Sequence, residues 1–168
     1  MIDTASPSAT GRDSGRNGTA ESTGNGARGG RRERPRILVA EDDADDREIY
    51  GRMLAYNGFD VIFAADGETA LRLARSRRPD LLLLDLGLPL LSGLDVCAEL
   101  RRDAATAGLP IIALTAFARE RMGQHARRAG CTTYIEKPVS PVSVLHAVES
   151  LIGKAPLPGV GSPPTVTE

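Results

Sequence analysis

The stretch LLLLDLGLP, residues 81–89, places four leucines directly before an aspartate, Asp85, which a turn with glycine and proline follows. A short apolar run that ends in turn residues is typical of a strand buried on both faces, as in a parallel sheet. A carboxylate at the end of such a strand costs free energy unless a partner compensates its charge. Asp85 is therefore either a solvated strand cap or part of a functional site.

Similar apolar runs occur on both sides of this stretch, and segments with apolar residues at helical spacing separate them. Asn57-Gly58 is a stop signal for the first helix, and Pro141 is a start signal for the last. The fourth helix, near 119–129, is interrupted by Gly123. Strands that alternate with helices predict an α/β fold, a parallel sheet with helices on both faces. The predicted strands are residues 36–40, 59–64, 80–84, 110–114 and 133–135.

The chain divides by composition into three parts. Residues 1–34 are rich in Gly, Ser, Thr and Arg and contain only Met1 and Ile2 from the larger apolar types, so they cannot bury enough surface to fold. Residues 154–168 are rich in Pro and Gly and are predicted to form a second disordered tail. The folded domain is therefore expected at 35–153.

Charge and apolar patterning restrict the function classes. With 21 basic and 22 acidic residues, the total charge gives no strong signal for nucleic-acid or membrane binding. No apolar run is long enough for a membrane span or a signal peptide, so a cytoplasmic protein is expected. Cys97 and Cys131 lack metal-ligand spacing, which favours a pair of reduced core residues.

Polar side chains follow four of the five predicted strands. Glu41 and Asp42 follow the first, Asp85 the third, Thr115 the fourth and Lys137 the fifth. The carboxyl ends of parallel strands meet at one edge of the sheet, where α/β proteins bind ligands. Three acids there repel one another unless a cation lies among them, and carboxylates with room for water indicate Mg²⁺ rather than zinc.

These motifs together resemble a response-regulator receiver domain, the phosphoacceptor module of two-component signalling. The resemblance covers residues 36–152 and is carried by four elements in the family's order and spacing: ILVAEDD (37–43), LLLLDLGLPLLSG (81–93), ALTA (113–116) and YIEKP (134–138). It implies a flavodoxin-like fold with a five-stranded parallel sheet in the order 2-1-3-4-5.

The resemblance implies a role for each acidic residue. Asp85 is similar to the phosphoacceptor, whose carboxylate becomes an acyl phosphate. Asp42 and Asp85 would ligate Mg²⁺ directly, together with the backbone carbonyl of Gly87, and Glu41 would hold a coordinated water. Glu41 stands where the family more often has Asp.

It also implies a switch. Lys137 would pair with the Asp85 carboxylate and then with a phosphoryl oxygen, and Thr115 would donate its hydroxyl to another. Tyr134 resembles the aromatic residue whose rotamer follows that movement, although an ordinary core aromatic would also fit its position.

The expected function is therefore a phosphorylation-dependent switch and not a turnover enzyme, although a receiver domain assists its own phosphorylation and dephosphorylation. The implied partners are a sensor histidine kinase or phosphotransfer protein and a downstream signalling protein, with no direct DNA binding and no membrane contact. No output domain is recognisable after residue 153, as in a single-domain regulator.

Three alternatives remain open at this point. A receiver that no longer accepts phosphate could act as a scaffold. An aspartate-nucleophile phosphatase would need a second acid where Gly87 stands. A nucleotide-binding module would need a glycine-rich loop where the first strand is followed by EDDADD (41–46), which would repel phosphates.

Overall fold

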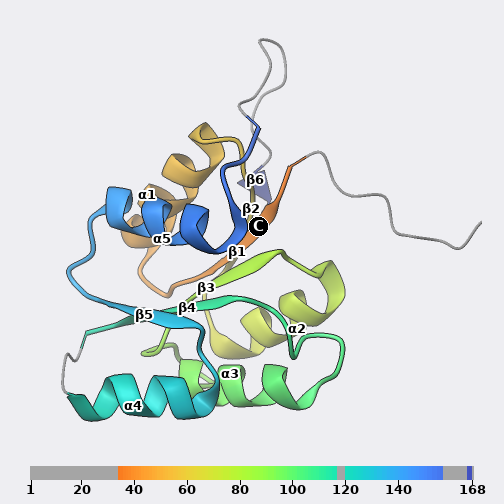
Figure 1. The fold of residues 1–168 in the computed structure, drawn as a ribbon, viewed down its shortest axis with the longest axis vertical. Helices are drawn as coiled ribbons and strands as arrows, with labels where there is room; N and C mark the ends of the chain where they lie inside the picture. Colours follow the sequence, from red (N-terminus) through yellow and green to blue (C-terminus); the bar gives the residue numbers. More distant parts are fainter. Residues whose placement is uncertain (1–33, 117–119, 157–165, 168) are drawn as a thin grey trace, which may run out of the picture. The chain divides into compact units, whose positions relative to one another are not determined.

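A parallel β-sheet forms the centre of the computed structural model, which describes residues 34–116, 120–156 and 166–167 (Figure 1). These residues all belong to one compact unit, Arg32–Glu168. The strand order is β5-β4-β3-β1-β2-β6, so the predicted order 2-1-3-4-5 is confirmed. The strands are β1 (Arg36–Ala40), β2 (Asp60–Ala64), β3 (Leu81–Asp85), β4 (Ile111–Thr115), β5 (Thr133–Glu136) and β6 (Val166–Thr167).

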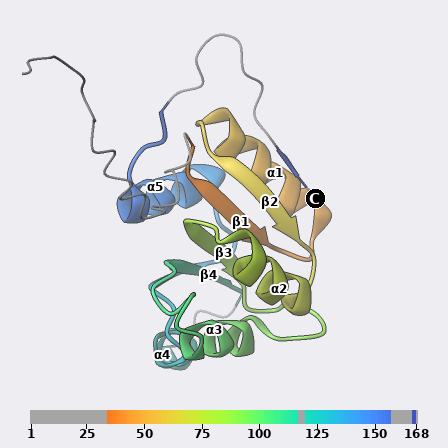
Figure 2. The same ribbon diagram turned by 90° about the vertical axis from the view of Figure 1, so that its right-hand side faces the viewer.

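Helices cover both faces of this sheet, as Figures 1 and 2 show from two directions. One face is covered by α1 (Ala44–Tyr56) and α5 (Pro141–Ile152). The other face is covered by α2 (Gly67–Arg77), α3 (Gly93–Arg102) and α4 (Glu120–Ala129). Each of the first five strands is thus followed by a helix, which is the predicted α/β arrangement.

Short polar side chains fix where the helices begin. Asp43 accepts hydrogen bonds from the backbone N–H groups of Asp45 and Asp46 at the start of α1. Ser140 caps α5, where Pro141 occupies the first turn. Such caps satisfy backbone donors that lack a partner inside the helix, each stabilising it by about 1 kcal/mol. The cap of α1 follows directly on the acidic pair at 41–42.

The strand quoted at the outset is buried on both faces, as predicted. Every residue of β3 is buried. Leu81 and Leu83 pack with the α1 and α5 side of the core, and Leu82 and Leu84 pack with the α2, α3 and α4 side. This alternation follows from the two-residue period of a strand. It leaves Asp85 at the carboxyl end of a strand that is fixed by packing on both sides.

A sixth strand, β6, extends the sheet beyond the five predicted strands. It pairs in parallel with β2, with Val61 opposite Val166 and Ile62 opposite Thr167.

The domain boundaries stay a prediction, because most of both predicted tails lies outside the described residues. The residues outside the described ranges there are 1–33, 157–165 and 168. Within the described ranges, no helix has the length and apolar character needed to cross a bilayer.

Candidate functional site

Three carboxylates meet at the carboxyl ends of β1 and β3. These strands are neighbours, with Ala40 opposite Leu84, so the residues that follow them lie side by side. One oxygen from each of Glu41, Asp42 and Asp85 lies within 4.8 Å of the others. Glu41 is 1% exposed and Asp85 is buried, whereas Asp42 is exposed. The structure thus brings together the acids that the sequence predicted to meet.

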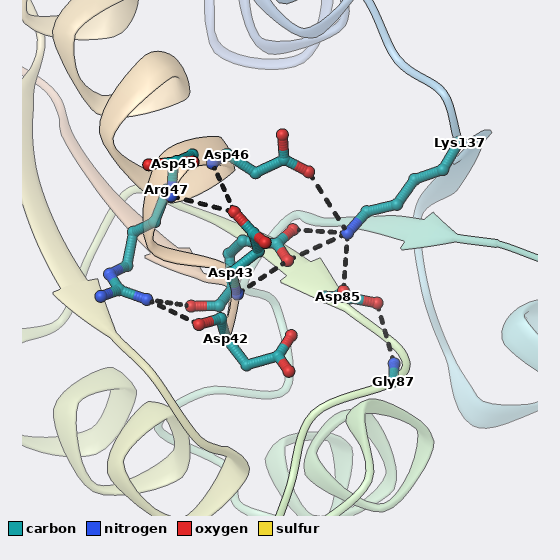
Figure 3. A network of polar contacts seen from close by, with 9 residues as sticks. Asp42, Asp43, Asp45, Asp46, Arg47, Asp85, Gly87 and Lys137 are labelled. Carbon is teal, nitrogen blue, oxygen red and sulfur yellow. Dashed lines mark hydrogen bonds and ion pairs between the residues drawn. The ribbon is translucent and has the colours of Figure 1, made fainter.

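Lys137, which follows β5, reaches into this acidic cluster (Figure 3). Its ammonium nitrogen lies 2.7 Å from Oδ2 of Asp85, and 2.7 and 3.0 Å from the two carboxylate oxygens of Glu41. Asp46 of α1 is a more distant neighbour at 3.9 Å. Asp85 is therefore a buried carboxylate with a cationic partner and not a solvated strand cap. The bond to Glu41 was not part of the prediction.

The pKa values of this cluster reflect burial and mutual charge. Burial raises the pKa of Glu41 from 4.5 to about 7; the hydrogen bond from Lys137 lowers it, and the charge of Asp85 raises it. Burial alone would lower the pKa of Lys137, but hydrogen bonds to Asp85 and Glu41 outweigh this effect and raise it. Lys137 therefore stays an ammonium at neutral pH, whereas Glu41 beside it keeps its proton to a higher pH than usual. An added cation would lower the free-energy cost of ionising Glu41.

Asp85 is held from two sides. Its Oδ1 accepts a hydrogen bond from the Gly87 N–H at 2.8 Å, while its Oδ2 accepts one from Lys137. The start of α3 also approaches closely, because a Cβ on Gly93 would lie only 2.3 Å from the backbone oxygen of Asp85. The prediction assigned the carbonyl of Gly87 to a metal; the role of its N–H emerges only from the structure.

Arg47 of α1 holds the backbone that carries the acidic pair. Its Nη1 donates to the carbonyl oxygens of Glu41 at 2.8 Å and of Asp42 at 3.2 Å. Sequence reasoning missed this residue. An arginine among exposed acids in the first turns of a helix is typical of a solvated surface, and no local signal distinguishes Arg47 from that case.

Thr115 and Tyr134, two of the residues predicted to form the switch, lie on β4 and β5. Thr115 ends β4, is buried, and accepts the backbone N–H of Lys137 on its carbonyl oxygen at 2.8 Å. Tyr134 on β5 is 39% exposed, with the guanidinium carbon of Arg127 6.0 Å from its ring centroid. The Lys137–Pro138 peptide is cis. Phe117, two residues past Thr115, lies outside the described residues.

The donor set fits Mg²⁺. Glu41, Asp42 and Asp85 supply oxygen ligands alone, and exposed Asp42 leaves one side of the cluster open to water. Mg²⁺ prefers carboxylate oxygens and retains several waters, whereas zinc prefers histidine and cysteine. The excess of acid over Lys137 at this edge favours binding of a cation.

Comparisons with known proteins agree with this fold. The family model for the response regulator receiver domain matches residues 37–149. The polar-differentiation response regulator DivK of Brucella anthropi is 35% identical over 119 residues, which cover 71% of this chain and 97% of that protein.

Solved structures show the same similarity. A putative response regulator from Chloroflexus aurantiacus is 30% identical, with a TM-score of 0.68 over 72% of this chain and 99% of its own. The receiver domain of a sensor histidine kinase from Pseudomonas aeruginosa PAO1 is 32% identical, with a TM-score of 0.66 over 72% and 99%; a magnesium ion is coordinated in its active-site cleft. With its flavodoxin-like sheet and its acids at the ends of β1 and β3, the chain belongs to the response regulator receiver family.

Proposed function

We propose that this domain is a phosphoacceptor switch, in which Asp85 takes a phosphoryl group from a histidine kinase or a phosphotransfer protein. One observation supports this assignment above the others. Asp85 is buried at the end of β3, and its two oxygens are oriented by the Gly87 N–H and the Lys137 ammonium. Preorganised donors of this kind position the nucleophile and balance its charge, and phosphoryl transfer depends mainly on these two effects.

The transfer step follows from this geometry. A carboxylate oxygen of Asp85 attacks phosphorus, the P–N bond of a phosphohistidine breaks, and the electron pair returns to the imidazole. Lys137 pairs with the carboxylate before transfer and with a phosphoryl oxygen afterwards, so a positive charge stays beside the transferred group. Asp42, Asp85 and the Gly87 carbonyl would hold Mg²⁺, with Glu41 binding through water. When bound, the ion supplies charge neutralisation on the phosphoryl oxygens.

The response to phosphorylation involves the ends of β4 and β5. The new group carries a charge near −2 and presents oxygen acceptors, so the Thr115 hydroxyl is drawn toward it. The end of β4 moves with Thr115, and Tyr134 on the neighbouring strand β5 changes rotamer with it. The hydrogen bond from the Lys137 N–H to the Thr115 carbonyl couples the two strand ends. A downstream signalling protein in the cytoplasm reads the changed surface.

Phosphorylation of the isolated protein tests the proposal. The intact mass is measured after incubation with Mg²⁺ and a small acyl-phosphate donor, for the natural protein and for Asp85→Asn. We expect one phosphoryl group on the natural protein, none on the variant, and none on either when EDTA replaces Mg²⁺.

Two results would count against the proposal. A phosphoryl group that persists in Asp85→Asn would exclude Asp85 as the acceptor. If the folded natural protein gains none from the donor or from histidine-phosphorylated kinase, the domain is a phosphate-independent scaffold. The phosphatase alternative fails on its own chemistry, because Gly87 stands where its second acid is needed.

A further inference from the structure

Two cysteines far apart in the sequence meet in the core. Cys97 lies on α3, and Cys131 lies between the end of α4 and the start of β5. Their sulfur atoms are 3.3 Å apart, with the Cys131 thiol donating to the sulfur of Cys97. Both are free thiols in the structure, 0% and 7% exposed respectively. The predicted reduced core pair is thus correct in burial, but the contact between the two sulfurs goes beyond it.

The backbone around both cysteines is held in place by hydrogen bonds. One turn after Cys97, the Arg101 side chain donates to the carbonyl oxygen of Gly130 at 2.8 Å. The Cys131 N–H donates to the carbonyl oxygen of Ala126 at 2.9 Å. A disulfide bond is about 2.05 Å long, so the sulfur atoms need to approach by only roughly 1.2 Å.

We infer that Cys97 and Cys131 form a redox pair, which a hydroperoxide oxidises to an intramolecular disulfide between α3 and the segment that leads into β5. The Cys97 thiolate attacks the O–O bond, becomes a sulfenic acid, and releases the other oxygen as water or alcohol. Cys131 then attacks the Cys97 sulfur, the S–S bond forms, and the sulfenic oxygen leaves with the Cys131 proton as water. Two thiols and one hydroperoxide are consumed, and a thiol reductant reverses the reaction.

The surroundings favour Cys97 as the first nucleophile. The hydrogen bond from Cys131 lowers the pKa of the Cys97 thiol, and the charge of Arg101 acts in the same direction. The thiolate is the reactive form of cysteine, so the hydrogen bond from Cys131 favours the reactive form of Cys97, although burial acts in the opposite direction.

Access to the pair depends on α4. Among the α4 side chains that the structure describes, residues 124–129, only Ala126 is buried. Cys131 is 7% exposed and lies just past the end of this helix, so a local opening at the end of α4 admits a small oxidant to both sulfurs.

The disulfide would act on the part of the domain that carries Tyr134 and Lys137. Both follow Cys131 within six residues, on β5 and directly after it. A covalent bond to α3 would prevent the opening of α4 and restrain the start of β5. The bond itself forms with or without phosphorylation, so its test does not depend on the proposed function.

Thiol counting by mass spectrometry tests the inference directly. The reduced full-length protein is treated with hydrogen peroxide, quenched with catalase, unfolded in a thiol-alkylating reagent and weighed intact. We expect two alkyl groups before oxidation. After oxidation we expect none, with a mass lower by two hydrogens, a monomer on a non-reducing gel, and recovery of both thiols with a reductant.

Single variants and a denatured sample provide the controls. Cys97→Ser and Cys131→Ser each keep one thiol and should gain oxygen instead of losing two hydrogens. The same chain in denaturant shows the peroxide dose that oxidises an accessible cysteine. If the folded natural protein keeps two alkylatable thiols at that dose, the inference is wrong. It is equally wrong if disulfides form only between two chains or if sulfonic acids accumulate in their place.

Discussion

Lys137 donates to both carboxylate oxygens of Glu41, at 2.7 and 3.0 Å, although the two residues are 96 positions apart in the sequence. The same ammonium also contacts Asp85. It therefore balances two buried acids at once, one of which is the proposed phosphoacceptor. We therefore expect Lys137 to stabilise the metal-free site, in addition to any contact with a phosphoryl group.

Removal of this ammonium should destabilise the metal-free protein. We expect Lys137→Met to lower the free energy of unfolding by about 2 kcal/mol, because it leaves two buried carboxylates without their cation. Urea denaturation in EDTA measures this loss, and Mg²⁺ should recover part of it by binding the same acids. Lys154→Met, at an exposed lysine, is the matched control and should have little effect. Equal stability of the two variants would contradict the structural role of Lys137.

Stability of the metal-free protein should depend on pH through Glu41. Burial raises its pKa from 4.5 to about 7, so the folded state binds this proton more tightly than the unfolded chain. The contribution of Glu41 is fully present below pH 4.5 and is lost as the pH rises through about 7. We expect the urea midpoint in EDTA to fall over this window, and to fall less in Glu41→Gln. An identical slope in both proteins would show that Glu41 does not titrate there.

Mg²⁺ affinity should depend on Asp42 without a cost in folding. Asp42 is exposed, so Asp42→Asn removes a ligand charge while the core stays intact. We expect calorimetric titration to show Mg²⁺ binding at least about tenfold weaker, as expected when one anionic ligand is lost. Asp45→Asn changes the net charge equally at another exposed acid, three residues away, and should bind Mg²⁺ normally. Equal weakening in both variants would indicate a general charge effect instead of a ligand at Asp42.

The close approach of α3 to the site can be tested at Gly93. A Cβ there would lie 2.3 Å from the Asp85 carbonyl oxygen and 2.7 Å from Leu86 Cα, and backbone atoms cannot move aside cheaply. We expect Gly93→Ala to reduce the free energy of unfolding by about 2 kcal/mol or more. Gly108→Ala is the control, because nothing lies within 4 Å of its Cβ position. Thermal unfolding measures the melting temperatures of both variants. An unchanged melting temperature for Gly93→Ala would contradict the packing described.

Much of the fold could be predicted from the sequence because its signals are local. Apolar periodicity and capping residues located five helices and five strands; the bounds of β1 match the prediction, and those of the other four strands differ from it by one residue. Asp85 itself, for example, belongs to β3 instead of following it. The convergence of Glu41, Asp42, Asp85 and Lys137 was predictable as well, because parallel strands place their carboxyl ends at one edge.

The contacts that were missed depend on long side chains and distant segments. Arg47 donates to two backbone carbonyl oxygens that precede it in the sequence, and Lys137 donates to the carboxylate of the distant residue Glu41. In both cases the conformation of a long, flexible side chain determines the partner. The contact between Cys97 and Cys131 depends on how α3 packs against the end of α4. Hydrophobic periodicity reports which face of an element is buried, but it carries no information on such pairings.

The short strand β6 has a consequence for self-association. An edge strand of a sheet presents unpaired backbone groups that can template the addition of a strand from another molecule. Here Val61 and Ile62 of β2 already have partners in Val166 and Thr167. β6 therefore covers part of this edge of the sheet, and it reduces the backbone surface on which a second copy could begin an intermolecular sheet.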